Sequence, residues 1–129
     1  MTTRRTADVD VVSFGETMIS FVGTQQPSVY TAIAAGAESN VAIGMARLGC
    51  STRWVSRVGD DPLGRLVVQT VEAAGVEVLV AVDPDHPTGV MVKHPAGEAK
   101  RSSYYRSESA ARGLSPSDRQ RFGTARWVH

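Results

Sequence analysis

Short apolar runs alternate with amphipathic segments along most of the chain. Residues 9–14 form an apolar run that predicts a buried strand, residues 52–58 predict a second strand, and alternating valines predict a third at 76–82. Between them, residues 41–48 and 62–74 repeat apolar side chains every three or four positions, which predicts two amphipathic helices. This order predicts an α/β fold with a mainly parallel sheet, because a crossover helix lets the next strand run in the same direction.

The first predicted helix begins near Asn40, whose side chain suits the N-cap position. Val41, Met45 and Leu48 would share its apolar face. Gly49 stands where a left-handed residue usually ends a helix.

The second predicted helix has the clearest boundaries. Asp61 can cap its first amides, Pro62 suits the first helical position, and Gly75 ends it. The apolar face would consist of Leu63, Leu66, Val67, Thr70, Val71 and Ala74.

Extended segments make up most of the remaining chain. Residues 17–22 continue from the first strand, and residues 88–94 and 99–106 predict a hairpin turning at 95–98. Ser115 and Pro116 open a short helix. Residues 125–129 read as the start of a buried strand, and because domains seldom stop inside a core strand, we expect an N-terminal piece of a longer protein.

Composition and charge narrow the class of protein. The 129 residues are 42% hydrophobic and 21% charged with a net charge of +1, which is typical of a globular domain and gives no support for a nucleic-acid partner. Residues 1–8 are expected to be a disordered tail rather than a signal peptide. The single cysteine and the lack of a long apolar run favour a cytoplasmic protein without a membrane partner.

Common nucleotide and metal motifs are missing from the sequence. No G-x-G-x-x-G follows the first strand, and the G-x-x-x-x-G matches at 44–49 and 59–64 lack the lysine of a phosphate loop. His86, His94 and His129 do not have the spacing of metal ligands, so we expect no metal site in this chain.

A longer pattern remains: Gly-Ala-Glu-Ser-Asn-Val-Ala at 36–42, then Gly49 and Gly59 at fixed distances from the asparagine. It resembles the ribokinase-like carbohydrate kinases, the PfkB family. Gly15-Glu16 and Pro87-Thr88-Gly89 extend the resemblance. It implies an α/β ribokinase-like three-layer fold, incomplete at the C-terminus, in which residues 9–129 are the N-terminal part of a kinase domain. Segments of about 17–30 and 88–106 would form a small β-lid.

Within that family, Glu38 and the triplet Tyr104-Tyr105-Arg106 are similar to the 2-keto-3-deoxygluconate kinases. The resemblance implies that the sugar acid is bound by Gly36, Ala37, Glu38, Asn40, Tyr104 and Arg106. Strand geometry agrees in part, because Tyr104 and Arg106, two positions apart, can share a face. A guanidinium also suits a carboxylate, to which it donates two hydrogen bonds at once.

Plainer interpretations stay open for several of these residues. Asn40 could be only a helix cap, Arg106 only a solvated edge charge, and Glu38 only a partner of the helix dipole. Ser20 stands where many relatives have a sugar-binding Asp, which fits a sugar-acid kinase. Met91 stands where some 2-keto-3-deoxygluconate kinases have a substrate-binding Tyr.

The resemblance implies a parent enzyme that phosphorylates a sugar or sugar acid with ATP and Mg²⁺. The catalytic Asp and the ATP site are expected beyond residue 129, so this chain would hold no catalytic residue and be inactive alone. Two alternatives remain: another kinase of the family, acting on fructose, ribose or a nucleoside, or a non-catalytic sugar-binding remnant. A homodimer through the β-lid is a further expectation.

Overall fold

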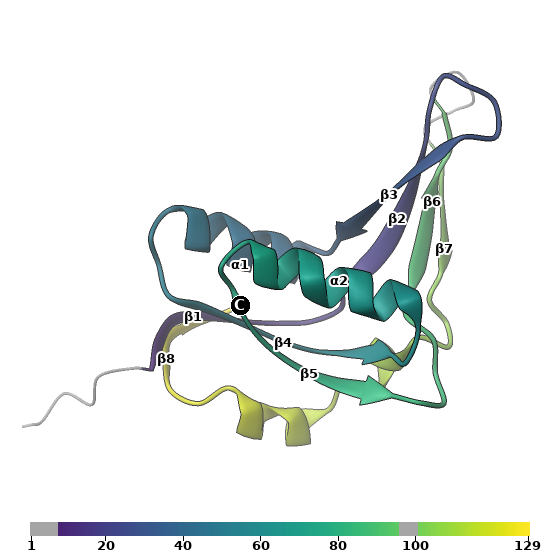
Figure 1. The fold of residues 1–129 in the computed structure, drawn as a ribbon. Coiled ribbons are helices and arrows are strands. Elements are labelled where there is room, and N and C mark those ends of the chain that lie inside the picture. Colours follow the sequence, from purple (N-terminus) through teal and green to yellow (C-terminus); the bar gives the residue numbers. More distant parts are fainter. Residues whose placement is uncertain (1–7, 96–100) are drawn as a thin grey trace, which may run out of the picture.

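Two β-sheets organise the chain in the computed structural model, which describes residues 8–95 and 101–129 (Figure 1). The first sheet has the strand order β5-β4-β1-β8. Its strands are β1 (Val9–Phe14), β4 (Thr52–Gly59), β5 (Glu77–Asp83) and β8 (Ala125–Val128). All its neighbouring strands pair in parallel, which confirms the predicted sheet and the three strands predicted at 9–14, 52–58 and 76–82.

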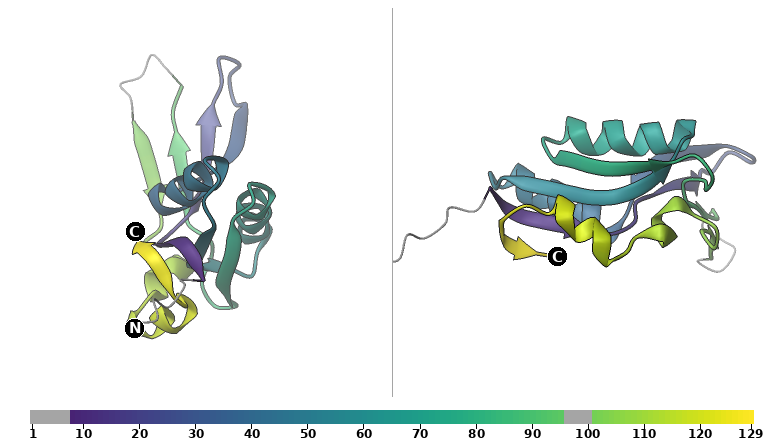
Figure 2. Two further views of the ribbon diagram at one scale, coloured as in Figure 1. Left: turned by 90° about the vertical axis from the view of Figure 1, so that its left-hand side faces the viewer. Right: turned by 90° about the horizontal axis from the view of Figure 1, so that it is seen from below.

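The second sheet projects from one end of the first (Figures 1 and 2). Its order is β3-β2-β6-β7, with β2 (Met18–Gly23), β3 (Tyr30–Ala35), β6 (Val90–Lys93) and β7 (Ser102–Tyr105). β6 and β7 pair antiparallel, as the predicted hairpin requires. Residues 96–98 of its predicted turn lie outside the described residues, as do residues 1–7 of the predicted tail.

Strand β3 was not predicted from the sequence. It pairs antiparallel with β2 along its whole length, so the first extended segment runs to Ala35 rather than ending at Tyr30. Its sequence, Tyr-Thr-Ala-Ile-Ala-Ala, is rich in alanine and lacks an alternation of polar and apolar residues. Neighbouring strands, rather than local propensity, hold such a segment extended.

Core residues lie on both faces of the parallel sheet, and helices cover each face. α1 (Ala37–Arg47) and α2 (Pro62–Ala73) cover one face, and the short 3₁₀-helices η1 (Ala110–Gly113) and η2 (Pro116–Arg121) cover the other (Figure 1). On the α-helical side the buried core consists of Ile19, Ala42, Trp54, Val58, Val67, Val71 and Val76. On the opposite side Val9, Val12 and Val55 are buried, and the rings of Phe14 and Phe122 meet edge to face with centroids 5.1 Å apart.

Helix α2 confirms its predicted boundaries. The Asp61 carboxylate accepts a hydrogen bond from the Gly64 N–H at 2.7 Å, and Pro62 occupies the first turn. Gly75 follows with φ +84°, the left-handed conformation expected at a helix end. Burial of Val67 and Val71 confirms two positions of the predicted apolar face, whereas Leu66 is exposed.

Helix α1 begins at Ala37, four residues earlier than predicted. Gly36 is the N-cap, and Asn40 lies inside the first turn, where its N–H donates to the Gly36 carbonyl at 2.9 Å. The interpretation of Asn40 as an N-cap is therefore wrong. Gly49 does follow the helix with φ +90°, as expected.

The buried face of α1 also differs from the prediction. Ser39 and Ala42 are buried, whereas Leu48, assigned to the apolar face, is 80% exposed. Ala42 belongs to the same buried cluster as Trp54 and Val58 of β4, so small residues rather than the largest apolar ones form the buried face of the helix. A count of hydrophobic residues cannot detect such a face.

The C-terminal segment contains both an agreement and a difference. Ser115 and Pro116 open a short helix, as predicted; it is a 3₁₀-helix, and Ser115 and Asp118 form a capping box at its start. Residues 125–128 form β8 at the edge of the sheet beside β1 (Figure 2). The side chains of Trp127 and Val128, expected to be buried, are exposed there.

Candidate functional site

The turn between β1 and β2 lies where predicted ligand-binding segments meet. Residues 15–17 follow the carboxyl end of β1, the edge at which parallel sheets bind ligands. The Trp54 indole N–H donates to the Gly15 carbonyl at 3.2 Å. Because Trp54 is fully buried, this bond anchors the turn to the core.

The start of α1 packs directly onto this turn. A Cβ added at Gly36 would lie 2.5 Å from the Glu16 carbonyl oxygen and 2.9 Å from the Thr17 Cα. Glu38 extends over Gly15, where an added Cβ would collide with its carboxyl group. The contact at Gly36 requires glycine, because the atoms that an added Cβ would meet include the backbone of Glu16 and Thr17, whereas at Gly15 the Glu38 side chain would have to move.

Arg106 reaches the same turn from the second sheet. Its Nη2 lies 2.7 Å from Oε2 of Glu16, whose side chain is 10% exposed, while the arginine side chain is 50% exposed. The other carboxylate oxygen of Glu16 accepts a hydrogen bond from the Ser109 hydroxyl at 2.6 Å. Arg106 is therefore held in an ion pair and is not simply a solvated edge charge.

Three of the six predicted binding residues thus converge: Gly36, Glu38 and Arg106 all contact residues 15–16 or the backbone beside them. Ala37 and Asn40 lie nearby in the first turn of α1 and are exposed. The first amides of a helix have no intrahelical partner, and Gly36 brings no side chain to cap them. Exposed N–H groups at a helix N-terminus attract oxygen atoms and anions.

Tyr104 is the residue least tied to this cluster. It is 58% exposed and lies opposite Met91, which pairs in turn with Ser20. The three side chains form one row across the sheet. Ser20 is completely buried, and its Oγ has no hydrogen-bond partner within the described residues.

Asp61 connects the start of α2 to the segment that leads into the second sheet. Its Oδ2 accepts from the Thr88 N–H at 2.8 Å, and the Thr88 hydroxyl accepts from the Gly59 N–H at 3.0 Å. Burial raises the pKa of Asp61, but the N–H groups of Thr88 and Gly64 outweigh it, and the pKa falls below its ordinary value. The carboxylate is therefore ionised at neutral pH, and its role here is structural.

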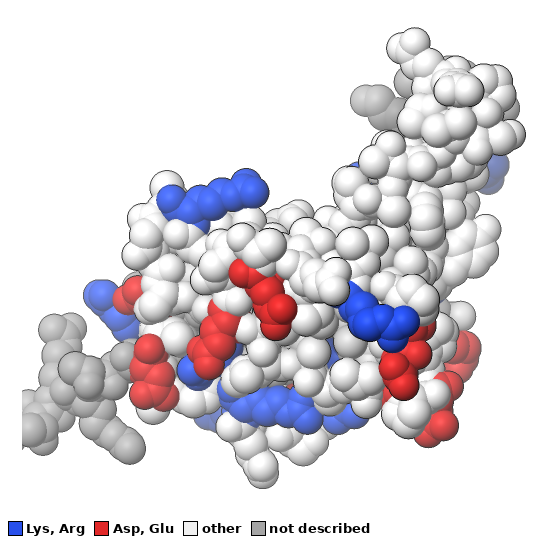
Figure 3. Space-filling model, in the orientation of Figure 1, with Lys and Arg blue, Asp and Glu red and all other residues white. Residues whose placement is uncertain are grey.

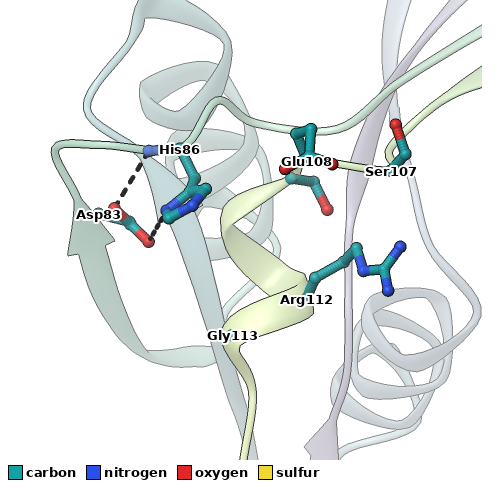
Figure 4. Close-up of a pocket in the computed structure, with 7 residues that line it drawn as sticks. Asp83, His86, Ser107, Glu108, Arg112 and Gly113 are labelled. Carbon is teal, nitrogen blue, oxygen red and sulfur yellow. Dashed lines mark hydrogen bonds and ion pairs between the residues drawn. The ribbon is translucent and has the colours of Figure 1, made fainter.

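A cavity of about 360 Å³ lies between the loop after β5 and the segment 107–113, and both line it (Figure 4). The His86 Nδ1 lies 3.0 Å from Oδ2 of Asp83 at its rim. The N–H of Asp85, together with His86, lowers the pKa of Asp83. His86 is therefore a partner of Asp83 in the loop after β5.

Charge and metal-binding groups are dispersed in the described part of the chain. On the face drawn in Figure 3, basic and acidic side chains are interspersed over the lower part, and the projecting sheet is mostly uncharged. Among the described residues, no three His, Cys, Asp or Glu side chains are grouped to hold a metal ion. Nor is any helix there long and apolar enough to cross a membrane.

Sequence reasoning did not assign roles to Glu16 and Ser109, although Glu16 belongs to the Gly15-Glu16 pair that extends the family resemblance. The position of Glu16 directly after a buried strand was a usable signal, because side chains there reach the ligand-binding edge. Ser109 is 93 residues away from Glu16 in sequence, so only the fold brings the two together.

The fold is that of an α/β protein with a parallel sheet, a helix that starts beside the end of β1 and a second sheet that brings an arginine to the same place. The chain belongs to the pfkB family of carbohydrate kinases, whose model matches residues 8–129. This membership confirms the resemblance inferred from the glycine and asparagine spacing.

Known relatives agree with this assignment. The chain is 38% identical over 118 residues to the 2-dehydro-3-deoxygluconokinase of Bacillus subtilis (strain 168), covering 85% of this chain and 36% of that protein. The crystal structure of 2-dehydro-3-deoxygluconokinase from Thermotoga maritima matches with a TM-score of 0.81 at 25% identity, over 93% of this chain and 40% of that one.

A fructokinase is also similar. The structure of the enzyme from Xylella fastidiosa with bound ATP matches with a TM-score of 0.78 at 26% identity, over 84% of this chain and 34% of that one. The chain therefore has the ribokinase-like α/β fold of these enzymes. It spans 36% of the length of the Bacillus relative.

Proposed function

We propose that the intact protein is an ATP-dependent kinase of a sugar acid, with 2-keto-3-deoxygluconate (2-dehydro-3-deoxygluconate) as the leading substrate. The observation that carries this proposal is the Arg106 guanidinium, half exposed and fixed 2.7 Å from Glu16 beside the start of α1. A cation next to free helix amides suits a ligand that has both a carboxylate and hydroxyl groups.

Each predicted binding residue has a task in this proposal. Arg106 donates to the carboxylate of the sugar acid, while Gly36 lets the ligand approach the backbone at the start of α1. Ala37 and Asn40 lie exposed beside these amides, where an asparagine side chain can both donate to and accept from a sugar hydroxyl. Tyr104 adds a hydroxyl and a ring surface from β7. The Glu38 side chain lies against Gly15 and borders the site there.

The phosphoryl-transfer half of the site is proposed to lie outside residues 1–129. ATP is the proposed donor, in line with the ATP-bound fructokinase to which the chain is similar. Mg²⁺ would shield the charge of the transferred phosphoryl group, and a carboxylate beyond residue 129 would accept the hydroxyl proton. We therefore infer that the 129-residue chain alone does not transfer phosphate.

Fructose is the second candidate substrate. Glu16 neutralises part of the Arg106 charge, which would make the site less selective for an anion, and the chain is similar to a fructokinase. Ribose and nucleosides are weaker candidates because Ser20 replaces the Asp that many sugar kinases of the family carry. A non-catalytic sugar-binding protein is the remaining alternative.

A kinase assay on the intact protein separates these possibilities. ADP release would be measured with ATP and 2-keto-3-deoxygluconate, fructose or ribose at matched concentrations. We expect the highest kcat/KM for the sugar acid, and no ATP-dependent phosphorylation by the 129-residue chain. A higher kcat/KM for fructose would identify fructose, not the sugar acid, as the preferred substrate. The absence of turnover with every sugar would favour a binding protein.

Assembly and location complete the proposal. Tyr30, Ile33, Tyr104 and Tyr105 expose large side chains on the second sheet, and its outer strands β3 and β7 have free edges in the part of the chain that the structure describes. A homodimer through this sheet would cover both features. A single cysteine suits a reducing compartment, so we infer a cytoplasmic enzyme.

A further inference from the structure

Glu16 connects three segments at the base of the second sheet. It follows β1, it binds Arg106 just after β7 at 2.7 Å, and it accepts from the Ser109 hydroxyl at 2.6 Å. It also lies against Gly89, where an added Cβ would be 2.5 Å from its Oε1. Each carboxylate oxygen therefore has a fixed neighbour, and the side chain has little room to rotate.

The ion pair leaves much of the guanidinium available. Arginine has five N–H donors in a planar fork, and the Glu16 contact engages its Nη2. The arginine side chain is 50% exposed although its partner is only 10% exposed, so half of the arginine stays accessible while the carboxylate that holds it is buried. A flexible arginine would lose side-chain entropy on binding a ligand, whereas an arginine held in this way has already lost it.

We propose that Glu16 is a positioning residue that holds Arg106 in the orientation that receives the substrate carboxylate, and that Ser109 holds Glu16. This inference rests on the proposed function, because it assigns Arg106 to the sugar acid. It differs from a purely structural role in its consequence: Glu16 would act on substrate affinity through Arg106 rather than on phosphoryl transfer.

Kinetics of the intact protein test this coupling in a double-mutant cycle. Glu16→Gln keeps the size of the side chain and removes its charge, and we expect it to raise the KM for the sugar acid about tenfold, equivalent to about 1.4 kcal/mol, with kcat within about twofold. Ser109→Ala should raise KM in the same direction by a smaller factor. In an Arg106→Ala background, Glu16→Gln should change KM by less than about twofold, because its partner is gone.

Glu77→Gln is the matched control. Glu77 pairs with Arg53 at the same distance of 2.7 Å, but at the start of β5, the opposite end of the sheet from the site. It should leave KM unchanged. Equal effects of Glu16→Gln with and without Arg106, or a loss confined to kcat, would overturn the inference.

A second measurement does not depend on kinase activity. The rate at which phenylglyoxal modifies Arg106, followed by mass spectrometry, should be several times higher in the Glu16→Gln variant than in the parent protein. The rate for Arg53 should be the same in both. If no sugar is phosphorylated, the proposed function fails, but this rate still decides whether Glu16 holds Arg106. An unchanged modification rate would contradict the positioning role.

Discussion

Replacing Gly36 by alanine tests the close approach of α1 to the β1–β2 turn. The new Cβ would lie 2.5 Å from the Glu16 carbonyl oxygen and 2.9 Å from the Thr17 Cα, where ordinary contact is 3.4–4 Å. These atoms belong to the backbone, so the helix start must move by roughly 1 Å. Overpacking of this kind costs about 1–3 kcal/mol. Gly36 has φ −165°, so the cost comes from crowding and not from backbone strain.

Gly44 provides the matched control within the same helix. An added Cβ there meets nothing within 4 Å. Gly44→Ala should therefore stabilise the protein by about 0.5–1 kcal/mol, the gain expected from replacing glycine in a helix interior. Both substitutions replace glycine by alanine, but their effects on the free energy of unfolding should have opposite signs.

Urea unfolding, followed by the fluorescence of buried Trp54, measures both changes. A Trp127→Phe background removes the exposed second indole. Gly36→Ala should also weaken binding of the sugar acid, because the amides at the start of α1 move. If Gly36→Ala were as stable as the parent and bound the sugar acid equally well, the close packing of α1 on the turn would be refuted.

Two further predictions concern Asp61 and Asp118, which are not among the proposed binding residues. Asp61→Ala removes the cap of α2 and the bond to the Thr88 N–H, and should cost about 2 kcal/mol in urea unfolding; a loss below about 0.5 kcal/mol would contradict this role. Burial raises the pKa of Asp118, but the Ser115 N–H and Arg57 outweigh it and hold the pKa below its ordinary value of 3.8. Its stabilisation should therefore be complete well above pH 3.8 and be lost as the pH falls through 3.8 toward the lowered pKa. The stability difference between the parent and Asp118→Asn should close over that range, and a difference independent of pH would contradict this reasoning.

The elements with strong local signals could be predicted from the sequence. The apolar residues at 9–14 and 52–58 and the alternating valines at 76–82 led to β1, β4 and β5, because such patterns are local signals of strands. The boundaries of α2 followed from Asp61, Pro62 and Gly75, whose conformational preferences act without tertiary contacts. β3 and the buried face of α1 could not be predicted, because partner strands and small-residue packing determine them.

Only part of the candidate site could be predicted from the sequence. The motif at 36–42 and the spacing of Asn40, Gly49 and Gly59 led to the family, and the Tyr-Tyr-Arg triplet led to Arg106. The partner of Arg106 could not be found in this way, because Glu16 lies 90 positions earlier in the chain and meets it only in the folded state. The predicted start of α1 was also too late, so Asn40 was interpreted as its N-cap although it is the fourth residue of the helix.

Affinity for 2-keto-3-deoxygluconate, measured by isothermal titration calorimetry on the intact protein, tests the assignment of Arg106 most directly. Arg106→Ala should weaken binding by about tenfold to a hundredfold, since a hydrogen bond to a charged group contributes about 1.5–3 kcal/mol. Arg65→Ala, which removes an exposed cation of α2, should leave the affinity unchanged. Equal affinities of Arg106→Ala and the parent would contradict the sugar-acid site.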